Sequence, residues 1–384
     1  MKRLFLASII ALSSAGAFAQ NAPGMKDAFK DKFYIGGALN TWMIDQRIHS
    51  ALNSVEKHFN SIVAENCMKC EELQPVEGQF NFKWADQFVD YGEANNMFII
   101  GHCLVWHSQC PAWMFQGKYR VPMTKELLIK RMRDHIYTVV GRYRGRVKGW
   151  DVVNEAIEDD GSFRKSPYYN IIGEEFIELA FKFAHEADPD AELYYNDYST
   201  DKPAKREAIV RLVKNLKAKG CRIDAVGMQS HVAFDTPLDE YEKSIEAFAA
   251  TGVKVQVTEL DLSVLPWPQQ GMGAAIEQNF EYRQQIDPYR DGLPEDVAQK
   301  QADFFCKLFE IYLRHAADMK RVTFWGVLDS ESWKNNWPVE GRVDYPLAFY
   351  GNGKEKPFVE QIMRMADPNI LPAKAPAKKT KKKK

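Results

Sequence analysis

Eight short apolar runs alternate with amphipathic helical stretches along this chain, and this alternation restricts its fold more than any other feature. The candidate strands are Phe33–Leu39, Ser61–Met68, Met97–Trp106, Val147–Glu155, Glu192–Asp197, Ala225–His231, Val253–Asp261 and Val322–Asp329. Helical periodicity occupies segments between them, such as Lys125–Tyr143, Gly173–Ala187, Lys205–Lys219, Pro237–Ala250 and Pro294–Ala317. Eight strand–helix units at this spacing predict a parallel sheet closed into a (β/α)8 barrel of the TIM type. The competing fold is an open doubly wound sheet, but no glycine-rich phosphate motif follows any candidate strand.

The two ends of the chain differ in composition from its body. Residues 1–19 have the pattern of a signal peptide: Lys2 and Arg3, an apolar run from Leu4 to Leu12, and small residues up to Ala19. The alternative is an N-terminal core helix. Residues 372–384 contain seven Lys and no acid, which predicts a disordered basic tail that is either solvated or adheres to an anionic surface.

The body between these ends, residues 20–371, contains no linker, internal repeat or Ser/Thr/Pro-rich spacer, and we expect a single domain. No later apolar stretch has membrane length, so the sequence predicts an exported soluble protein, periplasmic or secreted, and we expect a monomer. The segment Leu265 to Gly292 is expected to be an insertion over the C-terminal face of the barrel.

The overall charge balance bears on possible partners. Taking the nine cations of the two ends from a total of 51 leaves 42 basic residues against 52 acidic ones. An acidic body argues against a nucleic-acid surface and is compatible with a neutral polymer. Nine Trp residues are available to stack on sugar rings, although large aromatic residues also simply fill cores.

Two glutamates stand at the ends of apolar strands, Glu155 in Trp150 to Ala156 and Glu259 in Val255 to Asp261. Strand interiors favour Val and disfavour carboxylates, so each Glu needs a reason. In a barrel of this type both would lie at the C-terminal face, where active sites are built. The alternative for either one is a salt-bridged structural carboxylate.

A pair of carboxylates is the equipment of glycoside hydrolysis, in which one group must be protonated and the other ionised. Asp261 points to the same side of its strand as Glu259, and His231 could bridge the two and keep Glu259 ionised. Glu155 has Trp150, Trp106 and the uncharged Asn154 nearby in sequence or by strand adjacency. A less polar setting suits a general acid.

Seven separated blocks carry a family resemblance over about Lys26 to Met365. They are Glu65-Asn66-Cys67-Met68-Lys69, Gly101-His102-Cys103-Leu104-Val105-Trp106-His107, Trp150 to Ala156, Tyr194-Tyr195-Asn196-Asp197-Tyr198, Gly227-Met228-Gln229-Ser230-His231, Val257 to Asp261, and Phe324-Trp325-Gly326-Val327 with Ser332-Trp333. In this order the blocks resemble those of the glycoside hydrolase family 10 endo-β-1,4-xylanases. The resemblance implies xylan and xylo-oligosaccharides as substrates and neither metal nor cofactor.

The resemblance also implies a role for individual residues. Glu259 would be the nucleophile and Glu155 the acid/base of a retaining double displacement, with the two carboxyls about 5–5.5 Å apart. Asn154 would bond the 2-hydroxyl of the sugar at subsite −1. The supporting residues would be His231 and Asp261 beside the nucleophile and Asp151 and His102 beside the acid/base. Each supporting group could instead be a satisfied core polar residue.

Further residues would hold the sugar chain. The resemblance assigns Glu65, Asn66 and Lys69 to subsite −2, Gln109 and Trp106 to subsite −1, Trp325 and Trp333 to stacking on the glycone side, Asn196 and Tyr198 to the aglycone side, and Gln229 to the same set of substrate-binding residues. Alternatives to a xylanase are a retaining β-1,4-glucanase with the same barrel, and a non-catalytic glycan-binding barrel. The second predicts a lost acid or nucleophile, and both glutamates are present.

The six cysteines are Cys67, Cys70, Cys103, Cys110, Cys221 and Cys306. An even number in an exported protein permits disulfides, while a lone C-x-x-C at Cys67 and Cys70 could in principle contribute to a zinc site with nearby Cys or His. Cys70 and Cys110 stand where the family has an aromatic and an apolar residue, and Phe349-Tyr350 replaces its usual Phe-Asp. A Cys70–Cys110 disulfide could compensate for the first two departures.

Overall fold

The computed structural model describes residues 22–117, 122–266 and 286–372, and within these ranges the chain forms the predicted barrel. Its strands are β1 (Tyr34–Leu39), β2 (Ser61–Ala64), β3 (Phe98–Val105), β4 (Gly149–Asn154), β5 (Glu192–Asp197), β6 (Ala225–Met228), β7 (His231–Val232), β8 (Lys254–Leu262) and β9 (Met319–Phe324). Each consecutive pair from β1 to β6 is parallel, β1 pairs with β9, β9 with β8, and β8 closes the ring onto β6. The two-residue β7 extends the pairing along the far end of β8. The (β/α)8 prediction is therefore confirmed.

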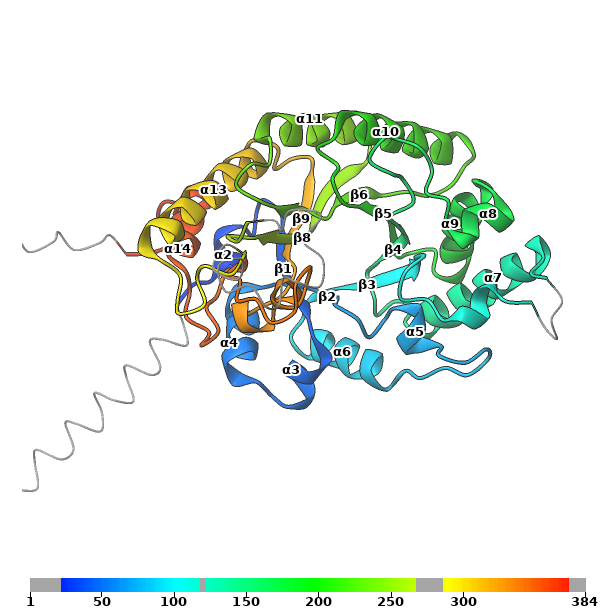
Figure 1. Ribbon diagram of the computed structural model, residues 1–384, viewed down its shortest axis with the longest axis horizontal. Coiled ribbons are helices and arrows are strands. Elements are labelled where there is room, and N and C mark those ends of the chain that lie inside the picture. The colour runs from blue at the N-terminus through cyan, green and yellow to red at the C-terminus, as the bar shows by residue number, and fades with distance from the viewer. Residues whose placement is uncertain (1–21, 118–121, 267–285, 373–384) are drawn as a thin grey trace, which may run out of the picture.

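Helices surround this ring (Figure 1). Their bounds are α2 (Met25–Ala28), α3 (Thr41–Asp45), α4 (His49–His58), α5 (Cys70–Leu73), α6 (Lys83–Ala94), α7 (Lys125–Arg142), α8 (Pro167–Ile172), α9 (Glu175–Ala187), α10 (Pro203–Ala218), α11 (Leu238–Ala249), α13 (Glu295–Arg314) and α14 (Pro357–Ala366). Short 3-10 turns, η1 (Ala112–Phe115), η4 (Asp329–Glu331) and η5 (Trp333–Asn335), follow β3 and β9.

Local sequence explains where these helices begin and which face they bury. The Thr124 hydroxyl accepts a hydrogen bond from the Leu127 N–H at the start of α7, and Ser166 caps α8 in the same way ahead of a proline at its first position. In α9 the buried residues recur at the helical period: Phe176, Ile177, Ala180, Phe181 and Ala184. That stripe packs the helix onto the barrel, where burial of apolar surface stabilises it by about 25 cal/mol per Å2.

The core has two layers, because alternate strand residues face opposite sides. The larger layer fills the space between strands and helices, and the smaller one lies inside the barrel and includes Val63, Ile100 and Tyr194. Gly101 shows how tightly the outer layer is packed. A Cβ at this position would lie 2.1 Å from the Trp150 ring, so any larger residue would push that indole out of place.

Several predicted strand boundaries are wrong at the C-terminal face. β2 ends at Ala64 rather than at Met68, and the run predicted as Ala225–His231 is broken after Met228 because Ser230 has a φ of 65°. β9 begins at Met319 and ends at Phe324, so Trp325 to Asp329 lies beyond the strand. After β9 the apolar run continues through Trp325 to Leu328 into a loop, and hydrophobicity alone does not mark that change.

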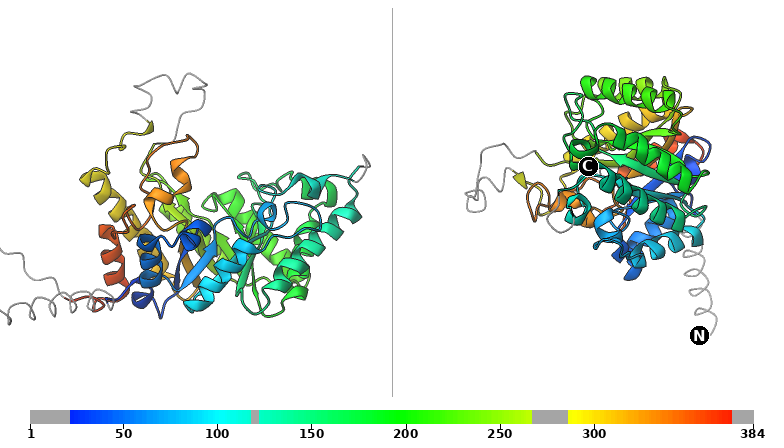
Figure 2. Two further views of the ribbon diagram at one scale, coloured as in Figure 1. Left: turned by 90° about the horizontal axis from the view of Figure 1, so that it is seen from below. Right: turned by 90° about the vertical axis from the view of Figure 1, so that its right-hand side faces the viewer.

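The loops that follow the strands form the face that carries the candidate site. In the left view of Figure 2 the segments before α13 and after β9 rise on the same side of the strands. They are joined there, since Arg290 Nη2 donates to the Gly341 carbonyl at 2.8 Å and the Val343 N–H to Asp287 at 3.0 Å. The predicted insertion lies only in part within the described residues, and the predicted signal peptide and nearly all of the basic tail lie outside them. Among the described helices, none has the length and apolarity needed to cross a bilayer.

Candidate active site

A cavity of about 670 Å3 opens at the C-terminal face of the barrel and brings together most of the predicted site residues. Of the seventeen, fourteen line it: Glu65, Asn66, Lys69, His102, Trp106, Gln109, Asn154, Glu155, Tyr198, Gln229, His231, Glu259, Trp325 and Trp333. The other three, Asp151, Asn196 and Asp261, lie behind this lining and bond to residues that form it. Residues distant in sequence therefore meet at one polar, aromatic-walled cleft, as a barrel requires.

Glu155 lies one residue beyond β4, in a strained backbone conformation with a φ of 57°. Its N–H donates to the Asn196 carbonyl at 2.9 Å, and its own carbonyl accepts from Arg164 Nε at 2.8 Å. A non-glycine residue at positive φ costs about 1–3 kcal/mol, and such strain persists only where the surroundings hold it. The backbone turn aims the carboxyl into the cleft.

The side chains that donate hydrogen bonds to the Glu155 carboxyl are all uncharged. Oε2 accepts from the Trp106 indole at 2.9 Å, and Oε1 accepts from Gln229 Nε2 at 3.0 Å and from Asn154 Nδ2 at 3.3 Å. None of these three donors carries a charge, so none ties Glu155 to the ionised form as strongly as a cation would.

Glu259, inside β8, has a charged neighbour instead. His231 Nε2 lies 3.2 Å from Glu259 Oε2, and His231 Nδ1 lies 2.8 Å from Asp261 Oδ2, so the imidazole bridges the two carboxylates as the sequence predicted. Burial opposes charge on all three groups. For His231 the burial is outweighed by the charge and hydrogen bonds of Asp261 and Glu259, which raise its pKa to about 9.

The same contacts lower the carboxylate pKa values. Burial would raise the pKa of Glu259, but the hydrogen bond from His231, the charges of His102 and His231, and the bond from Asn196 outweigh it and lower that pKa. The pKa of Asp261 is likewise lowered against its burial by His231 and Lys334, whose Nζ lies 3.5 Å from Asp261 Oδ1. Glu259 is therefore held as a carboxylate at neutral pH.

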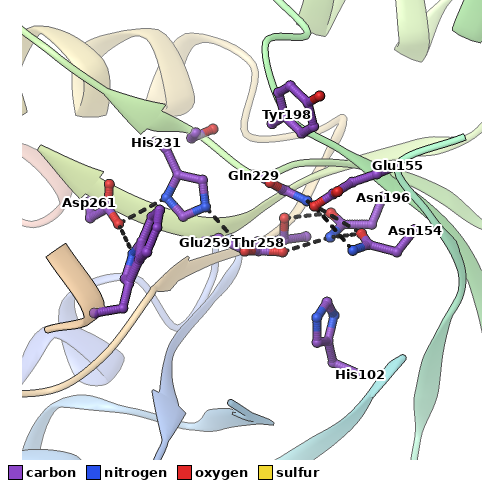
Figure 3. Close-up of polar contacts among 12 residues, drawn as sticks. His102, Asn154, Glu155, Asn196, Tyr198, Gln229, His231, Thr258, Glu259 and Asp261 are labelled. Carbon is purple, nitrogen blue, oxygen red and sulfur yellow. Dashed lines mark hydrogen bonds and ion pairs between the residues drawn. The ribbon is translucent and has the colours of Figure 1, made fainter. Parts of the chain in front are cut away.

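An amide network joins the two glutamates (Figure 3). Asn196 Nδ2 donates to Glu259 Oε1 at 2.8 Å and to Asn154 Oδ1 at 2.9 Å, while Thr258 Oγ1 donates to Asn196 Oδ1 at 2.6 Å. Asn154 in turn donates to Glu155. Because each amide N–H donates to an acceptor in a fixed position, the network fixes the orientation of both carboxyls.

Asn196 departs from its predicted place. The resemblance put this residue on the aglycone side, but it is completely buried and bonds to Glu259 and Asn154. Residues on β5 alternate between the barrel interior and the helical layer, and Asn196 falls on the interior side. It therefore holds the Glu259 carboxyl from behind and does not line the cleft.

Trp150 also departs from the prediction. It was expected to give Glu155 a less polar setting, but it lies in the outer layer, with its ring centre 6.5 Å from that of Tyr143, the residue that follows α7. A register irregularity in β4 between Asp151 and Val153 interrupts the alternation, so Trp150 faces the helices while Asn154 lines the cleft. Trp106 is the indole that contacts Glu155.

Beneath the cleft, His102 Nδ1 lies 2.9 Å from Asp151 Oδ2, and both residues are buried. Asp151 also lies 3.8 Å from Arg321 Nη2. His102 contacts the edge of Trp325, with ring centres 5.3 Å apart, and its charge acts on Glu259. The predicted tuning of the acid/base by this pair stays a prediction.

Polar side chains line one end of the cleft. Lys69 Nζ donates to Asn66 Oδ1 at 2.8 Å and to Gln109 Oε1 at 2.6 Å, and it lies 5.1 Å from the centre of the Trp106 ring. Burial raises the pKa of Glu65, with the charge of Lys69 opposing it. Crowded, mutually bonded donors and acceptors of this kind suit the hydroxyls of a neutral sugar.

Aromatic rings form the remaining walls. Trp333 Nε1 donates to Asp261 Oδ2 at 2.9 Å, and its ring stacks on that of Trp337 with centres 5.1 Å apart. On the opposite side Tyr198 accepts from Arg164 Nη2 at 2.5 Å, and Lys205 Nζ lies 3.7 Å from the centre of its ring. These faces are available to stack against sugar rings.

The sequence reasoning missed three residues that line the cavity: Ser199, Lys334 and Trp337. Two of them had a signal in the sequence: Lys334 directly follows the predicted Trp333, and Trp337 is one of nine Trp residues available to stack on sugars. They sit in and after a 3-10 turn, where strand periodicity gives no guide to which side chains reach the site.

The described residues include six cysteines and one cluster of potential metal ligands. All six cysteines are free thiols, so no Cys70–Cys110 disulfide is formed. Within the described ranges, the one group of side chains that could share a metal ion is Glu242, Glu246 and His315, which does not include the C-x-x-C. Arg314 and His315 already pair with Glu242 at 2.7 and 2.8 Å, so this cluster is explained as a salt-bridge network.

The fold and the site together define a class: a (β/α)8 barrel whose cleft holds two glutamates in chemically different settings, as in glycoside hydrolases. The sequence profile described as glycosyl hydrolase family 10 matches residues 24–365. The chain belongs to this family.

Named relatives agree with this placement. The chain is 53% identical over 351 residues, 91% of its length and 95% of the relative's, to endo-1,4-β-xylanase A of Xylanibacter ruminicola. It matches the solved structure of a GH10 endoxylanase from a sugarcane soil metagenome with a TM-score of 0.83 at 45% identity, covering 89% of this chain and 99% of that one. A glutamate-to-alanine mutant of the intracellular xylanase of Thermoanaerobacterium saccharolyticum, complexed with xylotetraose, matches with a TM-score of 0.77 at 37% identity over 89% and 99% of the two chains.

Proposed function

We propose that this protein is an endo-1,4-β-xylanase that cleaves xylan with retention of configuration. The observation that carries the proposal is the difference between the two glutamates: Glu259 bonds to a cationic His231, whereas Glu155 bonds to uncharged donors. An ionised nucleophile facing a carboxyl that can hold a proton is the arrangement that double displacement needs. The xylanases similar to this chain along nearly its whole length supply the substrate class.

In the first step Glu259 attacks the anomeric carbon while Glu155 gives its proton to the leaving oxygen. The bond between the anomeric carbon and that oxygen breaks, and a glycosyl ester forms on Glu259. Glu155, now ionised, then takes a proton from a water molecule that attacks the same carbon and frees Glu259. His231 remains protonated throughout and offsets the charge that Glu259 regains.

The cleft holds the sugar chain by hydroxyl bonding and ring stacking. We assign Glu65, Asn66 and Lys69 to the sugar at subsite −2, Gln109 and Trp106 to subsite −1, and Trp325 and Trp333 to stacking there. Gln229 and Asn154 then bond near the reacting sugar, and Tyr198 stacks on the leaving side. Hydroxyl bonding and ring stacking bind an uncharged polymer. The acidic body of the chain does not repel such a substrate.

A β-1,4-glucanase is the second candidate, and one observation weighs against it. A glucosyl unit carries a hydroxymethyl group that a xylosyl unit lacks. Lys69 is only 6% exposed and its Nζ is bonded to both Asn66 and Gln109, so this wall has little freedom to move aside. A non-catalytic glycan-binding barrel is disfavoured because both glutamates and their supporting contacts are intact.

We further propose that residues 1–19 direct export and that residues 20–371 form the catalytic domain, with a basic tail from 372. The support is the charged start, the short apolar run and the small residues up to Ala19. N-terminal sequencing of protein recovered from cell fractions tests this. A mature chain that begins at Gln20 outside the cytoplasm supports it, and an intact Met1 in the cytoplasm contradicts it.

The substrate is tested by incubating the purified protein with linear xylan and, separately, with cellulose. We expect xylobiose and xylotriose from xylan, released together with longer fragments at early times, and no soluble sugar from cellulose. Comparable release from cellulose would favour the glucanase. Release of xylose alone from chain ends would contradict internal cleavage.

A further inference from the structure

Two cysteines meet directly behind the polar end of the cleft. Cys70 is the first residue of α5 and follows Lys69, and Cys110 follows Gln109 just before η1. The two loops are tied together at this point, because the Glu71 N–H donates to the Gln109 carbonyl at 3.1 Å and Gln109 Nε2 donates to Glu71 Oε1 at 2.9 Å. Lys69 and Glu71, on either side of Cys70, therefore both contact Gln109, the residue before Cys110.

The thiols themselves are in contact. Cys70 and Cys110 share a side-chain hydrogen bond, which, together with burial, raises the pKa of Cys70 and, against burial, lowers the pKa of Cys110. Cys70 is 7% exposed and Cys110 is more accessible, so Cys110 is the thiol of this pair that a dissolved oxidant reaches first.

Two of the other cysteines, Cys67 and Cys306, have separate surroundings. Cys67, the partner of Cys70 in the C-x-x-C, lines a separate hollow with Asn40 and Trp84, and burial raises its pKa to about 12. Cys306 lies on α13, where its thiol donates to Gln361 at 3.1 Å. Sequence spacing would favour a Cys67–Cys70 pair, whereas the structure sets Cys70 against Cys110.

We propose that Cys70 and Cys110 are an oxidative modification site, at which a disulfide forms and clamps the loops after β2 and β3 behind Lys69 and Gln109. The oxidant is a small-molecule disulfide of the glutathione class. The Cys110 thiolate attacks one of its sulfurs, forming a mixed disulfide and expelling one thiolate. Cys70 then attacks the Cys110 sulfur and expels the second thiolate. The two protein thiols give up two electrons and two protons, and two molecules of glutathione are the products.

Clamping should stiffen this end of the cleft. The bridge would close a loop of about 40 residues, which in the chain-entropy account corresponds to a rise in the unfolding midpoint of about 5 °C for a domain of this size. The Lys69–Gln109 hydrogen bond at 2.6 Å would then be held by a covalent link one residue away on each side. The proposal does not depend on the xylanase assignment, because its readout is thiol chemistry.

The test incubates the reduced full-length protein with oxidised glutathione, alkylates it in denaturant and counts free thiols by mass spectrometry. We expect the wild type to fall from six free thiols to four, with a peptide link between Cys70 and Cys110, and its unfolding midpoint to rise and return with dithiothreitol. Six remaining thiols, a stable glutathione adduct on Cys110, or a link through Cys67 would each overturn the proposal.

Variants separate the site from general oxidation. Cys110→Ser and Cys70→Ser should each keep all five remaining thiols after oxidation. Two variants are used so that the result does not depend on one that folds poorly. Cys306→Ser is the matched control and should fall from five thiols to three. Loss of two thiols in Cys110→Ser would show that another pair reacts, and would contradict the proposal.

Discussion

At the scale of single residues, the chemistry of this protein lies in which atoms each glutamate contacts. Glu259 is bonded to His231, His231 is bonded to Asp261, and Lys334 lies 3.5 Å from Asp261. His231 and His102 both lower the pKa of Glu259. Glu155 contacts an indole and two amides. Identical side chains thereby receive different tasks from their surroundings.

The two glutamates should respond differently to truncation. Glu259→Ala removes the nucleophile, and we expect turnover of an aryl xylobioside to fall by about 10⁴-fold or more with the fold intact. Glu155→Ala should preserve the first step on substrates with good leaving groups and impair it on xylan, because only poor leaving groups need the proton. Burst and steady-state kinetics measure both. Equal impairment on the two substrate types would exclude Glu155 as the acid, and Glu207→Ala on α10 is the exposed control.

His231 should set the acidic limb of the pH–rate profile. Without its hydrogen bond and charge the pKa of Glu259 rises, so His231→Ala should move the limb of kcat/KM to higher pH. An unmoved limb would indicate a purely structural histidine. His185→Ala on α9 is the surface control.

The same residue links stability to pH. The folded-state pKa of His231, about 9, exceeds its ordinary value of 6.5. Its contribution to the free energy of unfolding is therefore fully present below pH 6.5 and is lost as pH rises through 9. Denaturant titrations across this window should show a loss in the wild type that is smaller in His231→Ala.

At the scale of elements, the turn after β4 does more than end a strand. Arg164 donates to the Glu155 carbonyl and to Tyr198, and lies 3.2 Å from Glu158. One guanidinium thus holds the strained backbone that aims Glu155. The Asp197–Lys205 pair, 2.8 Å apart and fully buried, supports Tyr198 from beneath.

Replacing this guanidinium tests that role. Arg164→Lys keeps the charge but cannot bond both partners at once, so we expect kcat on xylan to fall by roughly tenfold to a hundredfold with little change in unfolding midpoint. The pH–rate profile is measured alongside, because a displaced Glu155 would shift one of its limbs. Arg146→Lys, a surface ion-pair residue, is the matched control. Unchanged kcat in Arg164→Lys would contradict the positioning role.

Elements also show where sequence reasoning holds and where it fails. Period two placed Glu259 and Asp261 on one side of β8, and the shared His231 confirms it. The predicted places of Asn196 and Trp150 are wrong: Asn196 is buried behind Glu259, and a register irregularity in β4 turns Trp150 to the side opposite Asn154. Lys334 and Trp337 were missed because a 3-10 turn has no strand period.

At the scale of the whole molecule, eight repeated units predicted the barrel, since few other folds use eight parallel strands with helices between them. Closure itself depends on pairings between distant segments, β1 with β9 and β6 with β8, which no local pattern encodes. Closure is also what brings Glu65, Glu155 and Glu259 to one cleft. The roles of the individual site residues and the export of the chain stay predictions.

The anomeric configuration of the first product tests the central claim most directly. Proton NMR of an early digest of xylo-oligosaccharide, read before mutarotation, distinguishes the two outcomes. Double displacement through Glu259 predicts that the β anomer appears first and the α anomer follows by mutarotation. Initial appearance of the α anomer would mean a single displacement by water, and would contradict the assignment of Glu259 as nucleophile.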